Sequence, residues 1–290
     1  PFDRAFKEAR DSGVTTACVA PGSANAIAGQ ICVLKTAGKR VDNMVINPFL
    51  AMKMAFGENP KSIYGTKNQS PNTRMATAAL VREELFKAQR YKQDMEKAEE
   101  DEDESFPDFD AKLDALLPLI EKKVPAHIHA HRADDIFTAI RIAKEFDLDY
   151  VIVHCTDASI IAQELASENV KICLGPIIGG RTKPELYNHS VKSSGILHLN
   201  GLKVAINTDH PEVPIDMLAL SAAICYHNGL PYNEALNSIT CNASKLLKLD
   251  DKIGSLKSGK DGDILIFDGD PISGFNTPKT VIIDGKIIKE

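Results

Sequence analysis

From about residue 113 onward, short apolar runs alternate with segments of helical periodicity, and this alternation constrains the fold more than any other feature. The expected helices repeat apolar residues three and four positions apart, whereas the expected strands are runs of about five residues. Parallel strands require helical crossovers of this length, so the pattern predicts βα units in series. The strands are expected at Ala126 to Ala130, Tyr150 to His154, Val170 to Leu174 and Lys203 to Asn207.

Most of these strands end in, or are directly followed by, a polar residue, namely His131, His154 and Asn207. This feature separates the two architectures that βα units can build. In a TIM barrel the chemistry comes from the ends of many strands. An open, doubly wound sheet concentrates its chemistry at one switch point and usually carries a glycine-rich phosphate loop, which is not seen after the first expected strand, Gly13 to Ala20. The predicted fold class is therefore α/β, a (β/α)8 TIM-barrel-like domain over residues 1–249.

The two ends of the chain differ from this pattern. Residues 250–290 show period-two patterning with Gly and Asp turns and no helical repeat, which predicts a small β appendage. This appendage is too short to be stable alone, so we expect it to be the C-terminal part of a small β-sandwich domain packed on the barrel. The chain opens without Met, in an amphipathic helix that would normally follow another element. The barrel is therefore expected to be incomplete at its N-terminus.

Composition excludes several classes of partner. The net charge is −6 and no Lys/Arg-rich run occurs, so nucleic acid is not expected as a partner. No apolar run approaches the roughly 20 residues that a membrane span requires. The six cysteines form no C-x-x-C pair, and several lie in apolar runs, which is typical of free thiols in a reducing cytoplasm. A cytoplasmic enzyme acting on a small molecule fits these limits.

The segment VPAHIHAH carries the strongest chemical signal. Side chains alternate sides along a strand, so His127, His129 and His131 are expected to share one face. His154 ends the next strand, and Asp209 follows a later one. Imidazole nitrogen and carboxylate oxygen are zinc ligands, and three of them with one open position form a catalytic site. Zinc would lower the pKa of a bound water, and Asp209 could then carry its proton.

Each of these residues also has a structural interpretation. A histidine at the end of one strand is more often hydrogen-bonded in a core than bound to a metal. Asp209, with Pro211 two residues later, could cap a helix. Three such residues at equivalent places in successive βα units nevertheless favour a metal site.

These motifs resemble those of the metal-dependent amidohydrolase superfamily, in particular its imidazolonepropionase-like, N-acyl deacetylase-like and prolidase-like members. GVTT at Gly13 is similar to the second-strand motif, and TDHP at Thr208 is similar to the motif of the last strand. IGSLKSGKDGDILIFDGDP is similar to the C-terminal signature, with Gly262 in place of the usual alanine. The resemblance implies a distorted TIM barrel with one or two divalent ions and hydrolysis of an amide or cyclic amide.

The resemblance also implies roles for individual residues. His129 and His154 would hold one metal, while Asp209 would touch the other and act as general base and then general acid. The bridging ligand would be Glu58, with a carbamylated Lys53 as the alternative. The family pattern further requires a His-x-His ahead of the opening helix, which this sequence does not contain. We therefore expect little or no metal in this form of the chain.

Substrate contacts are expected from His131 and Arg132, just past the metal ligand, from Arg181 in the glycine-rich loop GPIIGGRTK, and from His210. Each of these side chains could equally face solvent. The sequence thus predicts a metal-dependent hydrolase of carbon–nitrogen bonds, with an aromatic-ring deaminase and a non-catalytic barrel scaffold as alternatives. An exposed sheet edge would invite pairing, so a homo-oligomer is also among the expectations.

Overall fold

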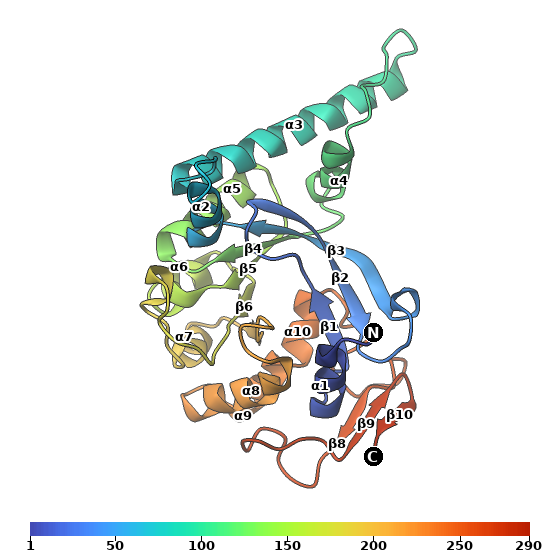
Figure 1. The fold of residues 1–290 in the computed structure, drawn as a ribbon, viewed down its shortest axis with the longest axis vertical. Coiled ribbons are helices and arrows are strands. Elements are labelled where there is room, and N and C mark those ends of the chain that lie inside the picture. Colours follow the sequence, from blue (N-terminus) through green and yellow to red (C-terminus); the bar gives the residue numbers. More distant parts are fainter.

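The computed structural model describes residues 1–290, and its larger sheet contains seven strands in chain order (Figure 1). They are β1 (Thr16–Val19), β2 (Ile27–Lys35), β3 (Val45–Ala55), β4 (Ala126–Ala130), β5 (Tyr150–His154), β6 (Ile172–Leu174) and β7 (Val204–Ile206). The pairs β1/β2 and β2/β3 are antiparallel, and every pair from β3 to β7 is parallel. Strands β1 and β7 each have one neighbour, so the curled sheet is an open half barrel.

The parallel strands are connected by helices, as the alternating pattern predicts. The helices are α1 (Arg4–Ser12), α2 (Glu58–Gly65), α3 (Arg74–Glu100), α4 (Ala111–Ile120), α5 (Ala133–Glu145), α6 (Ala162–Ser167), α7 (Ser193–Leu199), α8 (Leu218–His227), α9 (Tyr232–Ser238) and α10 (Cys241–Leu246). Ile128 of β4 and Ile152 of β5 are fully buried in one core with Ile136 and Ile140 of α5. This arrangement confirms the expected TIM-barrel-like α/β class.

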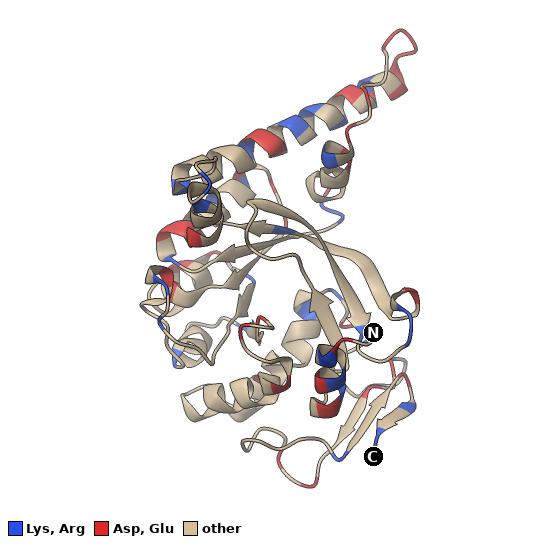
Figure 2. Cartoon of the chain, in the orientation of Figure 1, with Lys and Arg blue, Asp and Glu red and all other residues tan.

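Helix α3 is the longest helix, with 27 residues, and its start differs from the sequence expectation. The dipeptide Ser70-Pro71 suggests a helix start, yet the helix begins three residues later, where the Thr73 hydroxyl accepts a hydrogen bond from the amide of Ala76. Val81 and Leu85 face the core with no exposed surface. Lys, Arg, Asp and Glu alternate along the rest of the helix (Figure 2).

None of the helices is both long enough and apolar enough to cross a membrane.

A second, smaller sheet follows the barrel. It consists of β8 (Ile264–Ile266), β9 (Thr280–Ile283) and β10 (Lys286–Lys289), in the order β10-β9-β8, and it confirms the predicted C-terminal β appendage. The buried Lys35 at the end of β2 joins the two sheets. Its ammonium nitrogen lies 2.9 Å from carboxylate oxygens of both Asp261 and Asp263, and 3.2 Å from Asp284.

Candidate metal centre

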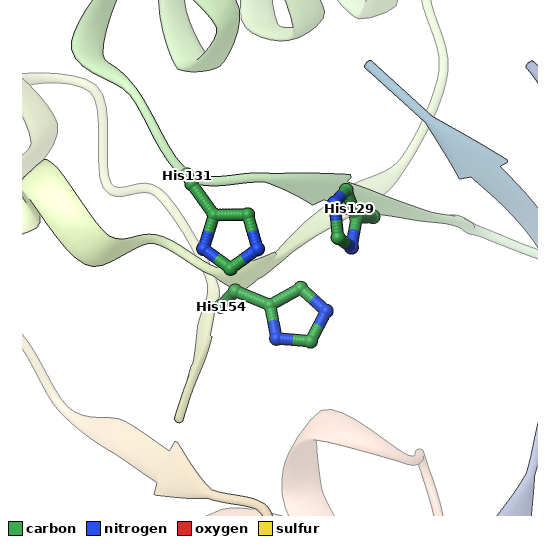
Figure 3. A group of neighbouring side chains, drawn as sticks. All are labelled: His129, His131 and His154. Carbon is green, nitrogen blue, oxygen red and sulfur yellow. The ribbon is translucent and has the colours of Figure 1, made fainter. Parts of the chain in front are cut away.

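Three buried histidines meet at the carboxyl ends of β4 and β5 (Figure 3). The ring centroids of His129 and His154 are 4.5 Å apart, and the ring of His131 lies 4.7 Å from each of them. One nitrogen from each ring falls within 4.8 Å of the others. The alternation along VPAHIHAH therefore brings His129 and His131 to one place, as expected, and the adjacent parallel strand supplies His154.

His154 is held in one tautomer. Its Nδ1 lies 2.8 Å from the carbonyl oxygen of Gly175, and because a carbonyl can only accept, Nδ1 carries the proton. Nε2 of the same ring is therefore an acceptor, and it is buried without a hydrogen-bond partner. A buried acceptor without a partner is costly, which favours a ligand at this position.

The other two rings are also oriented by neighbours. Nδ1 of His129 lies 3.0 Å from the hydroxyl of Ser23, and Nε2 lies 3.3 Å from the amide nitrogen of Asn59. Nδ1 of His131 lies 2.8 Å from the hydroxyl of Thr156. Such outer hydrogen bonds fix the ring orientation of histidines that bind metals.

All three rings are kept neutral. Burial lowers the pKa of His154 to about 3 and that of His131 to about 2. Burial also lowers the pKa of His129 well below its ordinary value, and the neighbouring histidines contribute in the same direction. Neutral imidazole is the form that binds a metal, so the group is ready to bind one without losing a proton first.

His129 and His131 border a cavity of about 550 Å³ inside the half barrel. Asp209, which follows β7, lies in its wall together with His210. Desolvation in the cavity raises the pKa of the Asp209 carboxyl, while Lys53 and Lys183 oppose that shift. His127, for which the sequence suggests a structural role, also lines the cavity, and its Nε2 is buried without a partner.

Lys53, rather than Glu58, lies with the histidines. Lys53 of β3 is the register partner of His127, so it shares a face with His127 and lines the cavity. Glu58 begins α2 and is turned aside, because its carboxylate accepts hydrogen bonds from Lys61 and Ser62. Arg74 lies 3.4 Å from the same carboxylate. Glu58 is therefore not among the residues that line the cavity, and its bridging role stays a prediction.

Two predicted substrate contacts also lie outside this cavity. Arg132 forms an exposed ion pair with Asp134. Arg181 donates to the carbonyl of His189 and lines a separate, neighbouring cavity of about 430 Å³. His131 and His210, in contrast, both line the cavity beside the histidine group.

The loop after β6 adds two residues that sequence reasoning missed. Lys183 lines the cavity, and its ammonium donates to Oδ1 of Asn59 at 3.1 Å. Glu185 is buried in the short helix η3 (Pro184–Leu186), with one oxygen 3.9 Å from Nε2 of His131. The sequence marks this segment only as a glycine-rich loop, which gives no indication that it folds back over the histidines.

The donor set fits one divalent ion. It combines three neutral imidazoles, one of them with a buried nitrogen that has no partner. Asp209, expected from sequence as a further ligand, lies in the wall of the adjoining cavity and outside this close group. Imidazole and carboxylate are the ligands of catalytic zinc sites. His131, assigned from sequence to substrate, would thus supply a third nitrogen from within the chain.

A half barrel that gathers imidazoles at the carboxyl ends of its parallel strands is typical of metal-dependent hydrolases with a barrel fold. The chain belongs to the Amidohydrolase family, whose sequence pattern matches residues 2–288. This finding confirms the resemblance drawn from the C-terminal signature and the strand-end motifs.

Individual relatives show the same relationship. The chain is similar to a crystal structure of an amidohydrolase from Thermotoga maritima, with 38% identity, a TM-score of 0.95, and coverage of 99% of this chain and 74% of that one. It is 28% identical to amidohydrolase tasK of Hapsidospora irregularis over 98% of this chain and 31% of that protein. It is 29% identical to the imidazolonepropionase of Fusobacterium nucleatum over 47% of this chain and 34% of that protein. The chain spans about a third of these two curated relatives.

Proposed function

We propose that the chain forms the catalytic barrel of a metal-dependent hydrolase that cleaves the carbon–nitrogen bond of a small amide or cyclic amide. The observation that carries this proposal is the group of three neutral imidazoles beside a cavity that also holds Asp209. Membership of the Amidohydrolase family and similarity to an imidazolonepropionase support the same chemistry.

His129, His131 and His154 would hold the ion, which we propose to be zinc. A bound divalent ion lowers the pKa of water and polarises a carbonyl group. Asp209 lies in the same cavity, where it can take a proton from the attacking water and deliver it to the leaving nitrogen.

For a site that holds two ions, we propose that a carbamylated Lys53 bridges them. Its place in the cavity beside His127 supports this choice, and the contacts of Glu58 with Lys61 and Ser62 argue against the alternative. The number of ions distinguishes the reaction classes, since a bridged pair favours amide hydrolysis and a single ion favours ring deamination. Similarity to a deaminase, at 29% identity over half of this chain, keeps that second candidate open.

A cytoplasmic location belongs to the same proposal. All six cysteines are free, although Cys18 and Cys173 line one cavity. Reduced thiols are typical of proteins in a reducing compartment.

The test is turnover of a panel of N-acyl amino acids, dipeptides and imidazolones before and after removal of the metal. The proposal predicts that a chelator abolishes turnover and that added zinc restores it. Turnover should also be lost in His154→Ala but kept in His227→Ala, because His227 is an exposed histidine on α8. If the zinc-loaded protein turns over none of these compounds, or if a chelator has no effect, the non-catalytic scaffold is the better interpretation.

A further inference from the structure

The loop between β6 and α7 lines part of the cavity and is fixed there by a buried anchor. Glu185 has only 2% of its surface exposed, and one of its oxygens accepts a hydrogen bond from the amide of Glu58 at 3.0 Å. The backbone at Gly57 makes room for this contact, since a Cβ atom there would lie 3.1 Å from the Glu185 carboxylate. The residues just before Glu185 are therefore held in place.

This anchor positions Lys183, two residues earlier. Its ammonium donates to Oδ1 of Asn59, and the amide nitrogen of the same Asn59 lies 3.3 Å from Nε2 of His129. A single side-chain amide thus separates the ammonium from the histidine group. Lys183 is exposed to solvent and forms no ion pair with a carboxylate, whereas the buried Lys35 forms three.

We propose that Lys183 binds a carboxylate of the substrate and so makes the enzyme selective for anionic amides. An ammonium that faces a binding cavity without a counter-ion is suited to a charged ligand, because the pair forms a charge-assisted hydrogen bond. The inference rests on the proposed hydrolase function and adds the charge of its substrate. It moves the anion contact from Arg181, which lies outside the cavity, to Lys183.

The other charges in the cavity decide which anion fits. Asp209 and Glu212 lie in the same wall, so they repel a doubly charged phosphate ester more than a singly charged carboxylate. The cavity has a second lysine, Lys53, which as the proposed carbamate carries no positive charge. Lys183 is then the one ammonium that can balance a negative charge. A carboxylate at a short distance from the scissile amide is therefore the chemistry that this cavity suits.

The experiment uses the zinc-loaded chain and compares three sets of substrates. These are N-acetyl amino acids, with one negative charge, their neutral C-terminal amides, and acyl aminoalkyl phosphates, with two negative charges. Lys183→Met should lower kcat/KM for the carboxylates by about tenfold or more and leave that for the neutral amides within about threefold. Lys183→Arg should restore most of the preference, because it restores the charge. Lys192→Met removes an exposed lysine at the end of the same loop and should change neither value.

Binding of N-acetylglycine and N-acetylglycinamide, measured by calorimetry, separates this inference from the proposed function, since it needs no turnover. Weaker binding of the acid alone in Lys183→Met supports the inference, even if no substrate is hydrolysed. The inference is overturned by an equal loss for acid and amide, by a loss in Arg181→Met instead, by a preference for the phosphates, or by no binding of either probe to the unaltered protein.

Discussion

The Nδ1 atom of His154 lies 2.8 Å from the carbonyl oxygen of Gly175, and this contact fixes the proton on Nδ1. The opposite nitrogen is left buried, unprotonated and without a partner, at the centre of the histidine group. The end of β6 therefore sets the ligand chemistry of a residue at the end of β5. Several consequences for stability and binding can be measured.

Replacing Gly175 by alanine should weaken metal binding, although Gly175 is not itself one of the proposed ligands. Gly175 has φ +138°, and a Cβ atom there would lie 2.3 Å from the carbonyl oxygen of Asn207. The backbone must shift, and the carbonyl that orients His154 shifts with it. We expect Gly175→Ala to weaken zinc binding by about tenfold to a hundredfold, measured by competition with a chelator.

Gly179→Ala is the matched control, because nothing lies within 4 Å of a Cβ atom at that position of the same loop. Its zinc affinity should equal that of the unaltered chain. Equal zinc affinity in Gly175→Ala and Gly179→Ala would show that the contact with His154 has no role in binding.

Asp209→Asn should separate proton transfer from metal binding. The asparagine keeps the size of the side chain but cannot accept a proton, so kcat should fall by about a hundredfold to ten-thousandfold. The ion held by the three histidines should stay bound, since Asp209 is not part of that close group. Steady-state kinetics with parallel zinc analysis checks both statements, and exposed Asp251→Asn is the control. An unchanged kcat in Asp209→Asn would show that Asp209 takes no part in proton transfer.

Lys35 should make stability depend on pH. Burial lowers its pKa, but the hydrogen bonds that it donates to Asp261, Asp263 and Asp284 outweigh burial and raise the pKa above its ordinary value. The stabilisation is therefore fully present below about pH 10.4, the pKa expected in the unfolded chain, and is lost as the pH rises through the folded-state pKa.

Denaturant unfolding of Lys35→Met tests this prediction. Two of the aspartates are partly exposed, with 31% and 53% of their side-chain surface accessible, so water screens part of the interaction. We expect a loss of roughly 2 kcal/mol in the free energy of unfolding at neutral pH, which shrinks in strongly alkaline solution. Arg40→Met, which removes an exposed pair with Asp42, should change little. A Lys35→Met loss that stays constant with pH would contradict the assignment.

The sequence predicted the elements that local pattern controls. Short apolar runs predicted the parallel strands, and the helical repeat predicted the crossovers. Alternation along one strand predicted that His129 and His131 share a face. The site residues that depend on loop paths were harder to predict. Glu58 as the bridging ligand stays a prediction, and its carboxylate is held by Lys61 and Ser62 on its own helix.

Long-range contacts account for the remaining differences. Lys183 and Glu185 reach the histidines through a loop whose sequence carries no periodicity. Arg181, in the same loop, lines the neighbouring cavity instead. The division of the chain after residue 249 and the formation of a homo-oligomer stay predictions.

The most direct test of the metal centre is calorimetric titration of the metal-free chain with zinc, alongside His129→Ala, His154→Ala and the control His227→Ala. The missing His-x-His predicts little or no metal, but the three grouped histidines lead us to predict at least one strongly bound ion per chain in the unaltered protein and in His227→Ala. We predict a large loss of affinity in the other two variants. Zinc binding that is absent in the unaltered chain, or equal in all four proteins, would contradict a metal centre formed by these histidines.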